Sequence, residues 1–162
     1  MLLDKLSQKA RQIENPRLDV EDAKTVLVRK ELIVFKEGGP ITTYKYTNFD
    51  DPATTVKTKL AKLHYDGHLD LFSVCNLANR KIILSGGEDE TGERKFATVY
   101  ALDTLNWKWQ INPLPDLNIA RSEHSSTSLG QAVYVACGEG DKGTRLSSVE
   151  RLWMGVSGDA DS

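Results

Sequence analysis

The side chains best suited to acid–base or metal chemistry are three histidines, His64, His68 and His124. His64 and His68 lie four residues apart, a spacing that places two ligands on one face of a helix. The residues between them, Tyr65-Asp66-Gly67, instead predict a turn, and no third ligand accompanies the pair. We therefore interpret His64 and His68 as solvent-facing polar residues and predict no metal site.

A second candidate for catalysis is the run Ser122-Glu123-His124-Ser125, which places a hydroxyl, a carboxylate and an imidazole in a row. A catalytic triad needs these groups to meet as nucleophile, base and orienting acid. Adjacent residues of a strand point to opposite faces of the sheet, so this run cannot assemble such a chain. We predict no catalytic residue here and do not expect an enzyme.

The loop at residues 86–92, Gly86-Gly87-Glu88-Asp89-Glu90-Thr91-Gly92, combines glycines with three acids. The acids would repel a phosphate, and no P-loop lysine follows the last glycine. They could attract calcium, but the EF-hand spacing is absent. We predict neither a cofactor nor a metal in this loop.

The net charge and the length of the apolar runs argue against two classes of partner, nucleic acids and membranes. The 162 residues include 21 basic and 23 acidic side chains, for a net charge of −2, so no global field favours nucleic acid or an anionic membrane. The longest apolar runs are far shorter than the ~18 residues of a membrane span.

Cys75 and Cys137 lie outside any CxxC motif, and we interpret both as buried, reduced thiols. The N-terminus lacks the pattern of a secretion signal, so we expect a cytoplasmic location.

The first segment predicts an amphipathic helix over residues 2–14. Leu2, Leu3, Leu6, Ala10 and Ile13 follow one another at helical spacing with polar residues between them. The Asn-Pro pair at residues 15–16 ends the pattern, because proline cannot continue a helix. The helix either packs on its own domain or is the remnant of a coiled coil.

From residue 25 onward the pattern changes to short apolar or alternating runs separated by turn residues, which predicts an all-β fold. The eleven expected strands cover residues 25–29, 31–36, 41–47, 55–63, 71–76, 81–85, 97–102, 108–111, 125–129, 132–137 and 147–152.

An internal repeat organises these strands. Lys81-Ile82-Ile83-Leu84-Ser85-Gly86-Gly87 aligns with Val133-Tyr134-Val135-Ala136-Cys137-Gly138-Glu139 at an offset of 52 residues. A period near 50 is typical of kelch propellers. After the glycine pair come Leu102, Trp109 and, before the next repeat, Ala120-Arg121-Ser122-Glu123-His124. In this order of motifs the chain resembles the kelch-repeat family.

The resemblance implies a β-propeller built from four-stranded blades. Glycines after a strand permit close backbone packing, and Trp109 offers a large apolar wedge between blades. The repeat departs from the family pattern where Glu139 replaces the second glycine and where Leu102 and Leu152 replace an aromatic residue. We assign residues 24–66 to a divergent first blade, 67–117 to a kelch blade and 118–162 to an incomplete blade with a tail.

About two and three-quarter blades cannot close a ring, since propellers typically need four to eight. The chain is therefore expected to be a piece of a longer protein, a half-ring completed by another chain, or an open stack of blades. We also expect self-association through the N-terminal helix or through unpaired blade faces.

The resemblance also implies the function, which is binding of a protein partner as a scaffold or adaptor, in cytoskeletal or ubiquitin-ligase contexts. The connections that lead into the first strand of each blade carry the expected contacts: Arg121, Ser122, Glu123 and Asp70. Kelch relatives bind acidic peptide segments with arginines and serines near these positions, although Arg121 could instead pair within its own blade. Two alternatives remain: an enzyme of the sugar-modifying or oxidase-like kelch type, and a fragment without function of its own.

Overall fold

The computed structural model describes residues 23–28, 31–36, 42–48, 51, 53–60, 63, 69–77, 80–110 and 114–154. These residues form eleven strands and one short 3-10 turn. The helix expected over residues 2–14 lies outside the described residues, as do His64 and His68. The prediction of an all-β fold is confirmed.

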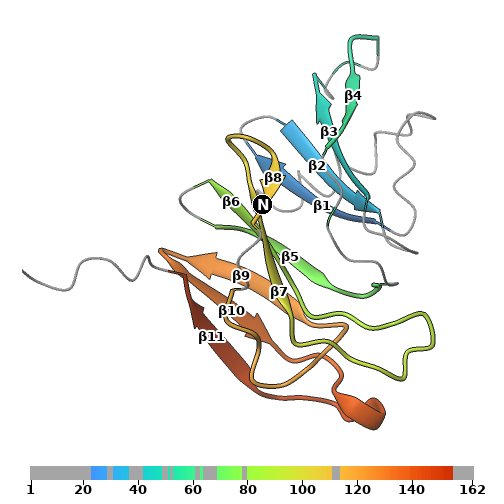
Figure 1. Cartoon of the computed structure of the whole chain (residues 1–162), viewed down its shortest axis with the longest axis vertical. Helices are drawn as coiled ribbons and strands as arrows, with labels where there is room; N and C mark the ends of the chain where they lie inside the picture. Colours follow the sequence, from blue (N-terminus) through green and yellow to red (C-terminus); the bar gives the residue numbers. More distant parts are fainter. Residues whose placement is uncertain are drawn as a thin grey trace, which may run out of the picture.

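The strands form three antiparallel sheets in which each strand pairs with its neighbour in sequence (Figure 1). Sheet 1 contains β1 (Ala23–Val28), β2 (Glu31–Lys36), β3 (Thr42–Thr47) and β4 (Val56–Lys59). Sheet 2 contains β5 (Ser73–Leu77), β6 (Lys81–Ser85), β7 (Val99–Asp103) and β8 (Lys108–Trp109). Sheet 3 contains β9 (Ser125–Leu129), β10 (Ala132–Ala136) and β11 (Val149–Trp153). Sheets 2 and 3 fall within the segments expected to form the second and third blades, and sheet 1 begins one residue before the expected first blade.

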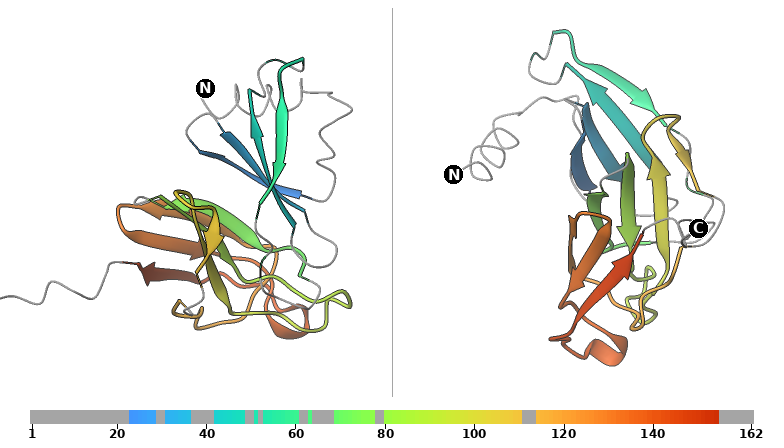
Figure 2. Two further views of the ribbon diagram at one scale, coloured as in Figure 1. Left: turned by 45° about the horizontal axis from the view of Figure 1, so that its top comes forward. Right: turned by 90° about the vertical axis from the view of Figure 1, so that its left-hand side faces the viewer.

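The sheets stack face to face, with their first strands β1, β5 and β9 side by side (Figure 2). One apolar cluster lies between sheets 1 and 2 and includes Ile33, Phe35, Ile82, Leu84 and Leu102. A second lies between sheets 2 and 3 and includes Cys75, Ile83, Val133, Val135 and Leu152. Because sheet 2 is buried on both faces, its central strand β6 is a continuous apolar run, which matches its sequence Ile82-Ile83-Leu84. Three stacked antiparallel sheets of this kind fit a partial β-propeller.

Trp109 joins sheet 2 to sheet 1. Its side chain is 9% exposed, and its ring meets Phe35 edge to face with 6.2 Å between ring centroids. Tyr100 makes a similar contact with Trp109 at 6.4 Å. Edge-to-face geometry is the favoured arrangement of aromatic pairs, so Trp109 is the predicted wedge between blades.

The strand register corrects the alignment of the glycine pair. Strands β5 and β6 are joined by a hairpin loop one residue longer than that between β9 and β10, because Leu77 pairs with Lys81 whereas Leu129 pairs with Ala132. The repeat offset is therefore 52 residues before the hairpin and 51 after it. It follows that Cys137 corresponds to Gly86, Gly138 to Gly87 and Glu139 to Glu88.

The backbone angles show the same correspondence. Gly86 and Cys137 have φ of 59° and 60°, while Gly87 and Gly138 have φ of 110° and 93°. A side chain on Gly86 would collide with the carbonyl oxygen of Arg121, which lies in the connection into β9. Cys137 has no described sheet beyond it, which explains why a residue with a side chain is tolerated there.

Candidate partner-binding face

One end of the stack gathers the loops that were expected to bind a partner. The connections into β5 and β9, residues 69–72 and 121–124, meet the loops after β6 and β10, residues 86–98 and 137–148. In sheet 2, Glu88 forms backbone bridges with both Asp70 and Lys95. In sheet 3, the corresponding residues Ser122, Glu139 and Arg145 repeat the same pair of bridges. We call this end the connection face.

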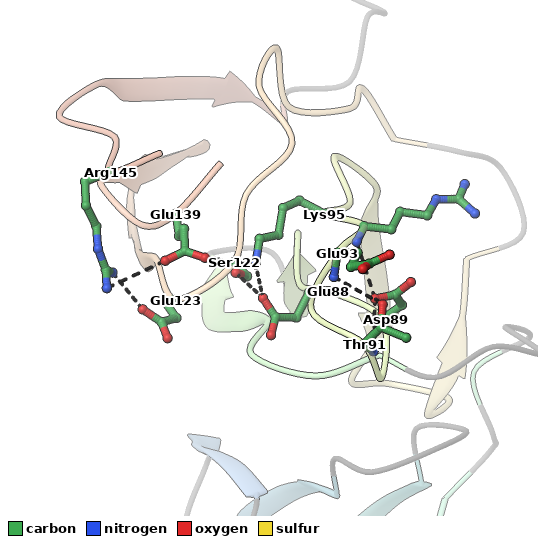
Figure 3. Close-up of polar contacts among 10 residues, drawn as sticks. Glu88, Asp89, Thr91, Glu93, Lys95, Ser122, Glu123, Glu139 and Arg145 are labelled. Atoms are coloured by element: carbon green, nitrogen blue, oxygen red, sulfur yellow. Dashed lines mark hydrogen bonds and ion pairs between the residues drawn. The ribbon is translucent and has the colours of Figure 1, made fainter. Parts of the chain in front are cut away.

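A buried ion network ties the two halves of the connection face together (Figure 3). Lys95 is 7% exposed and contacts the carboxylates of Glu88 and Glu139, the latter at 3.2 Å. The hydroxyl of Ser122 donates to Glu88 Oε2 at 2.6 Å. Burial alone would lower the pKa of Lys95, but the hydrogen bonds to Glu88 and Glu139 outweigh it and hold that pKa above its usual value. Lys95 is therefore charged and joins sheets 2 and 3.

Further out on the same face, Glu123 and Arg145 form an exposed ion pair at 2.8 Å. The side chain of Arg145 is 73% exposed and also lies 3.6 Å from Glu139 (Figure 3). Exposed pairs of this kind add little stability, so these charges are available to a partner without much loss to the fold.

The acid-rich loop after β6 is shaped by its own hydrogen bonds. Asp89 Oδ1 accepts from the amide of Thr91 at 3.2 Å, from its hydroxyl at 2.8 Å and from the amide of Arg94 at 3.4 Å (Figure 3). The hydroxyl bond is the main reason that the pKa of Asp89 lies below its usual value. Across the described residues, no group of three or more His, Cys, Asp or Glu side chains is arranged to hold a metal ion.

Arg121 is fully buried, so the structure contradicts its expected contact with a partner. Its guanidinium pairs with Glu150 at 2.5 Å and donates to the carbonyl oxygen of Cys137 at 2.9 Å. Glu150 in turn accepts from the backbone amides of Asn118 and Ile119 at 2.6 and 3.1 Å. The alternative interpretation holds: Arg121 pairs within its own blade and anchors the connection into β9.

The carboxyl of Glu150 belongs to the same anchor. Burial would raise the pKa of Glu150, but the hydrogen bond from Asn118 and the ion pair with Arg121 together bring that pKa below its usual value. Removal of one partner of a buried ion pair leaves an uncompensated buried charge and lowers the stability of the fold strongly. We therefore regard Arg121 and Glu150 as structural residues.

The other predicted contact residues divide into buried and accessible groups. Ser122 is fully buried with its hydroxyl on Glu88, which corrects its expected role as a partner contact. Glu123 is exposed, and Asp70 is partly buried. Three adjacent side chains thus have different partners, as expected: Ser122 contacts Glu88, Glu123 contacts Arg145 and His124 contacts Ser85.

A hollow of about 240 Å³ lies where the first strands of the three sheets begin, and the sequence analysis missed it. It is lined mainly by polar side chains from β1, β5 and β9 and by the residues that precede β5 and β9: Lys24, Thr25, Phe72, Ser73, Val74, His124, Ser125 and Ser126. Ser73 and Ser126 are hydrogen-bonded across it at 2.8 Å. The repeated serine at the start of β5 and β9 is the one sequence signal that could have indicated it.

His124 forms the buried wall of this hollow. Its Nε2 lies 3.0 Å from the hydroxyl oxygen of Ser85, while its buried Nδ1 has no hydrogen-bond partner among the described residues. Burial, with the nearby charges of Arg121 and Lys24, lowers the pKa of His124 to about 4. The imidazole is therefore neutral near pH 7.

The two cysteines differ in accessibility. Cys75 is buried between sheets 2 and 3, and burial raises the pKa of its thiol. Cys137 is exposed, so the expectation that both thiols are buried is wrong for Cys137. Its position at the end of β10, beside no further described sheet, explains the difference.

Comparison with known proteins informs the fold alone. No protein-family model matches the chain, and no curated protein matches it. Among solved structures, that of YjhT is similar, with a TM-score of 0.65 and 16% sequence identity over 84% of this chain and 43% of YjhT. The chain thus spans less than half the length of the structure it matches. None of the described helical residues forms a span long and apolar enough to cross a membrane.

Proposed function

We propose that this chain is part of a kelch-type β-propeller that binds a protein partner on its connection face and acts as a cytoplasmic scaffold or adaptor rather than as an enzyme. The observation that carries the proposal is the repeated construction of this face. The same bridge pattern holds Asp70, Glu88 and Lys95 in one sheet and Ser122, Glu139 and Arg145 in the next. Sequence repeats that build a continuous rigid surface are typical of binding scaffolds.

The connection face supplies the chemistry that a protein partner requires. The exposed charges of Glu123 and Arg145 lie on the same face as the buried Lys95 network, which holds the loops of this face in place. The hollow beside them is lined by the serine residues Ser73, Ser125 and Ser126. A few polar groups around a small recess can orient a side chain of the partner, whereas the rigid sheets limit the entropy lost on binding.

Affinity capture with point variants tests this proposal. The full chain would be immobilised and used to capture partners from the source cell, in parallel with Ser125→Trp, which fills the hollow, and Arg145→Glu, which reverses an exposed charge. Lys108→Glu is the matched control, because Lys108 is exposed at the opposite end of sheet 2. All variants change exposed residues, and circular dichroism checks that they remain folded.

We expect the two connection-face variants to lose a specific partner that the native chain and Lys108→Glu both retain. Equal capture by all four proteins would refute binding at this face. Turnover of a small molecule that depends on the residues of the hollow would instead favour the enzyme alternative.

A further inference from the structure

The hollow described above is lined mainly by groups that can donate hydrogen bonds. One ammonium and four hydroxyls come from the first strands of the three sheets: Lys24 and Thr25 from β1, Ser73 from β5, and Ser125 and Ser126 from β9. No carboxylate is among the described residues that line it. Its volume of about 240 Å³ is several times the ~30 Å³ that one water molecule occupies in the liquid, so a sizeable polar group fits inside.

The charges around the hollow favour an anion. The pKa of His124, which forms its wall, is lowered first by burial and next by the positive charges of Arg121 and Lys24. The carboxylate of Glu150 opposes these charges with a smaller effect. Because Arg121 is paired with Glu150, Lys24 is the cation that a bound anion would meet.

The donors differ in how readily a ligand can reach them. Thr25 and Ser125 are exposed, whereas Ser73 and Ser126 are partly buried and joined by a hydrogen bond of 2.8 Å. Strand β5 lies beside both β1 and β9, so Thr25 and Ser125 belong to strands on either side of it. Lys24 is partly buried, and salt therefore screens its charge less than that of a fully exposed lysine.

Donors that come from different strands suit a tetrahedral oxyanion. Planar carboxylates are recognised best by the paired N–H groups of arginine, and no arginine is among the described residues that line the hollow. Lysine acts as a point charge and is a common phosphate ligand, and hydroxyls can donate to the phosphate oxygens. We propose that the hollow binds the phosphate group of a phosphorylated serine or threonine in the protein partner. This inference rests on the proposed function and specifies the chemistry of the partner.

Short capped peptides test this chemistry directly. A peptide with a central phosphoserine, its unphosphorylated form and a form with glutamate in place of phosphoserine would each be titrated into the full chain at constant ionic strength. The ring resonances of His124 report binding by NMR, since this side chain lines the hollow. We expect the phosphoserine peptide to cause saturable shifts and to raise the pKa of His124 above about 4, because a nearby negative charge stabilises the imidazolium.

The other ligands define what the hollow recognises. The glutamate peptide should bind at least about fivefold more weakly than the phosphoserine peptide, and the unphosphorylated peptide should cause no shift. Equal binding of the glutamate and phosphoserine peptides, or no shift with either, would overturn the proposal. Inorganic phosphate that binds as tightly as the phosphoserine peptide would assign the hollow to free phosphate and overturn its assignment to a protein partner.

Two variants locate the anion site. Lys24→Gln should weaken binding of the phosphoserine peptide about tenfold and Ser125→Ala about threefold, since a hydrogen bond between two charged groups contributes more than one from a neutral hydroxyl. Lys108→Gln is the matched control at the opposite end of sheet 2 and should bind as the native chain does. Ser125 is exposed, so Ser125→Ala should keep the fold even if Lys24→Gln does not. Native-like binding by both hollow variants would show that the anion binds elsewhere and would refute the proposal.

Phosphatase treatment distinguishes this inference from the proposed function. An extract of the source cell would be divided, and one half would be treated with a protein phosphatase before capture by the immobilised chain. We expect the specific partner to be lost from the treated half. A partner captured equally from both halves would overturn the assignment to phosphate and leave binding at the connection face intact.

Discussion

Gly138 and Gly130 both have positive φ, at 93° and 61°, but only one of them is crowded. A Cβ on Gly138 would collide with the carbonyl oxygen of Ser122 and approach the side chain of His124, whereas a Cβ on Gly130 would have no neighbour within 4 Å. Alanine substitutions at these two positions therefore separate the free-energy cost of a steric collision from the free-energy cost of the backbone conformation.

We expect Gly138→Ala to lower the free energy of unfolding by about 2–4 kcal/mol, because strain at positive φ is added to a backbone collision. Gly130→Ala should cost only about 1 kcal/mol, which is the conformational cost alone. Denaturant unfolding of the two variants measures the difference. Equal destabilisation of both would show that the contact with Ser122 contributes nothing.

His124 makes the stability of the protein depend on pH. Its pKa of about 4 lies below the ordinary value of 6.5, so between these two pH values the unfolded chain binds a proton that the folded chain does not. Stability should thus fall as pH decreases from 6.5 to 4 and stop falling, for this group, below pH 4. The loss amounts to roughly 3 kcal/mol.

Histidine NMR titration measures this pKa directly, and His124→Gln identifies its resonance. The same variant provides the baseline for stability, since glutamine does not titrate. Its free energy of unfolding should change less than that of the native chain over this pH range. A His124 resonance that titrates near pH 6.5 would contradict the buried, neutral imidazole.

At the scale of elements, Trp109 couples sheet 1 to the rest of the molecule through its contact with Phe35. Trp109→Ala should lower the free energy of unfolding by about 3–5 kcal/mol, as expected for removal of a buried aromatic side chain. Hydrogen exchange should show that the amides of sheet 1 lose protection before those of sheet 3.

Trp153→Ala is the matched control, because Trp153 is 62% exposed on β11. Its effect should stay within about 0.5 kcal/mol. If removal of Trp109 costs no more than removal of Trp153, the tryptophan does not join the two sheets.

The strands themselves were largely predictable. β2, β6 and β9 begin and end as expected, because alternating or apolar runs bounded by turn residues depend on the local chain alone. The one-residue difference between the β5–β6 and β9–β10 hairpins was not predictable from motif alignment. Both hairpin loops are short and polar, and only the strand pairing shows where each ends.

At the scale of the whole molecule, no described sheet covers the face of sheet 3 that points away from sheet 2. Three large apolar residues on this face are exposed: Leu129 at 73%, Val149 at 63% and Trp153 at 62%. Sheet 2 buries both of its faces against neighbouring sheets, so a further sheet would cover the same area of sheet 3. Leu129 and Trp153 flank Ala132 on this face, and exposed apolar residues gathered in this way promote association in water.

The isolated chain should therefore associate as its concentration rises, as measured by sedimentation or light scattering. The double variant Leu129→Thr, Trp153→Thr should associate less while it keeps its fold, since both side chains are exposed. A native chain that stays monomeric at all concentrations would show that the exposed apolar residues of this face do not drive association.

The sequence by itself determined the all-β class, the number of strands in each segment, the repeat and the wedge position of Trp109. These features follow from residue alternation, turn residues and self-similarity, which are all properties of the chain as written. Only the tertiary structure decided that Arg121 and Ser122 are buried, that Cys137 is exposed, and that a hollow lies beside His124. The physical reason is that burial depends on which sheets stack against each other. Such contacts join residues about 50 positions apart, and no local pattern records them.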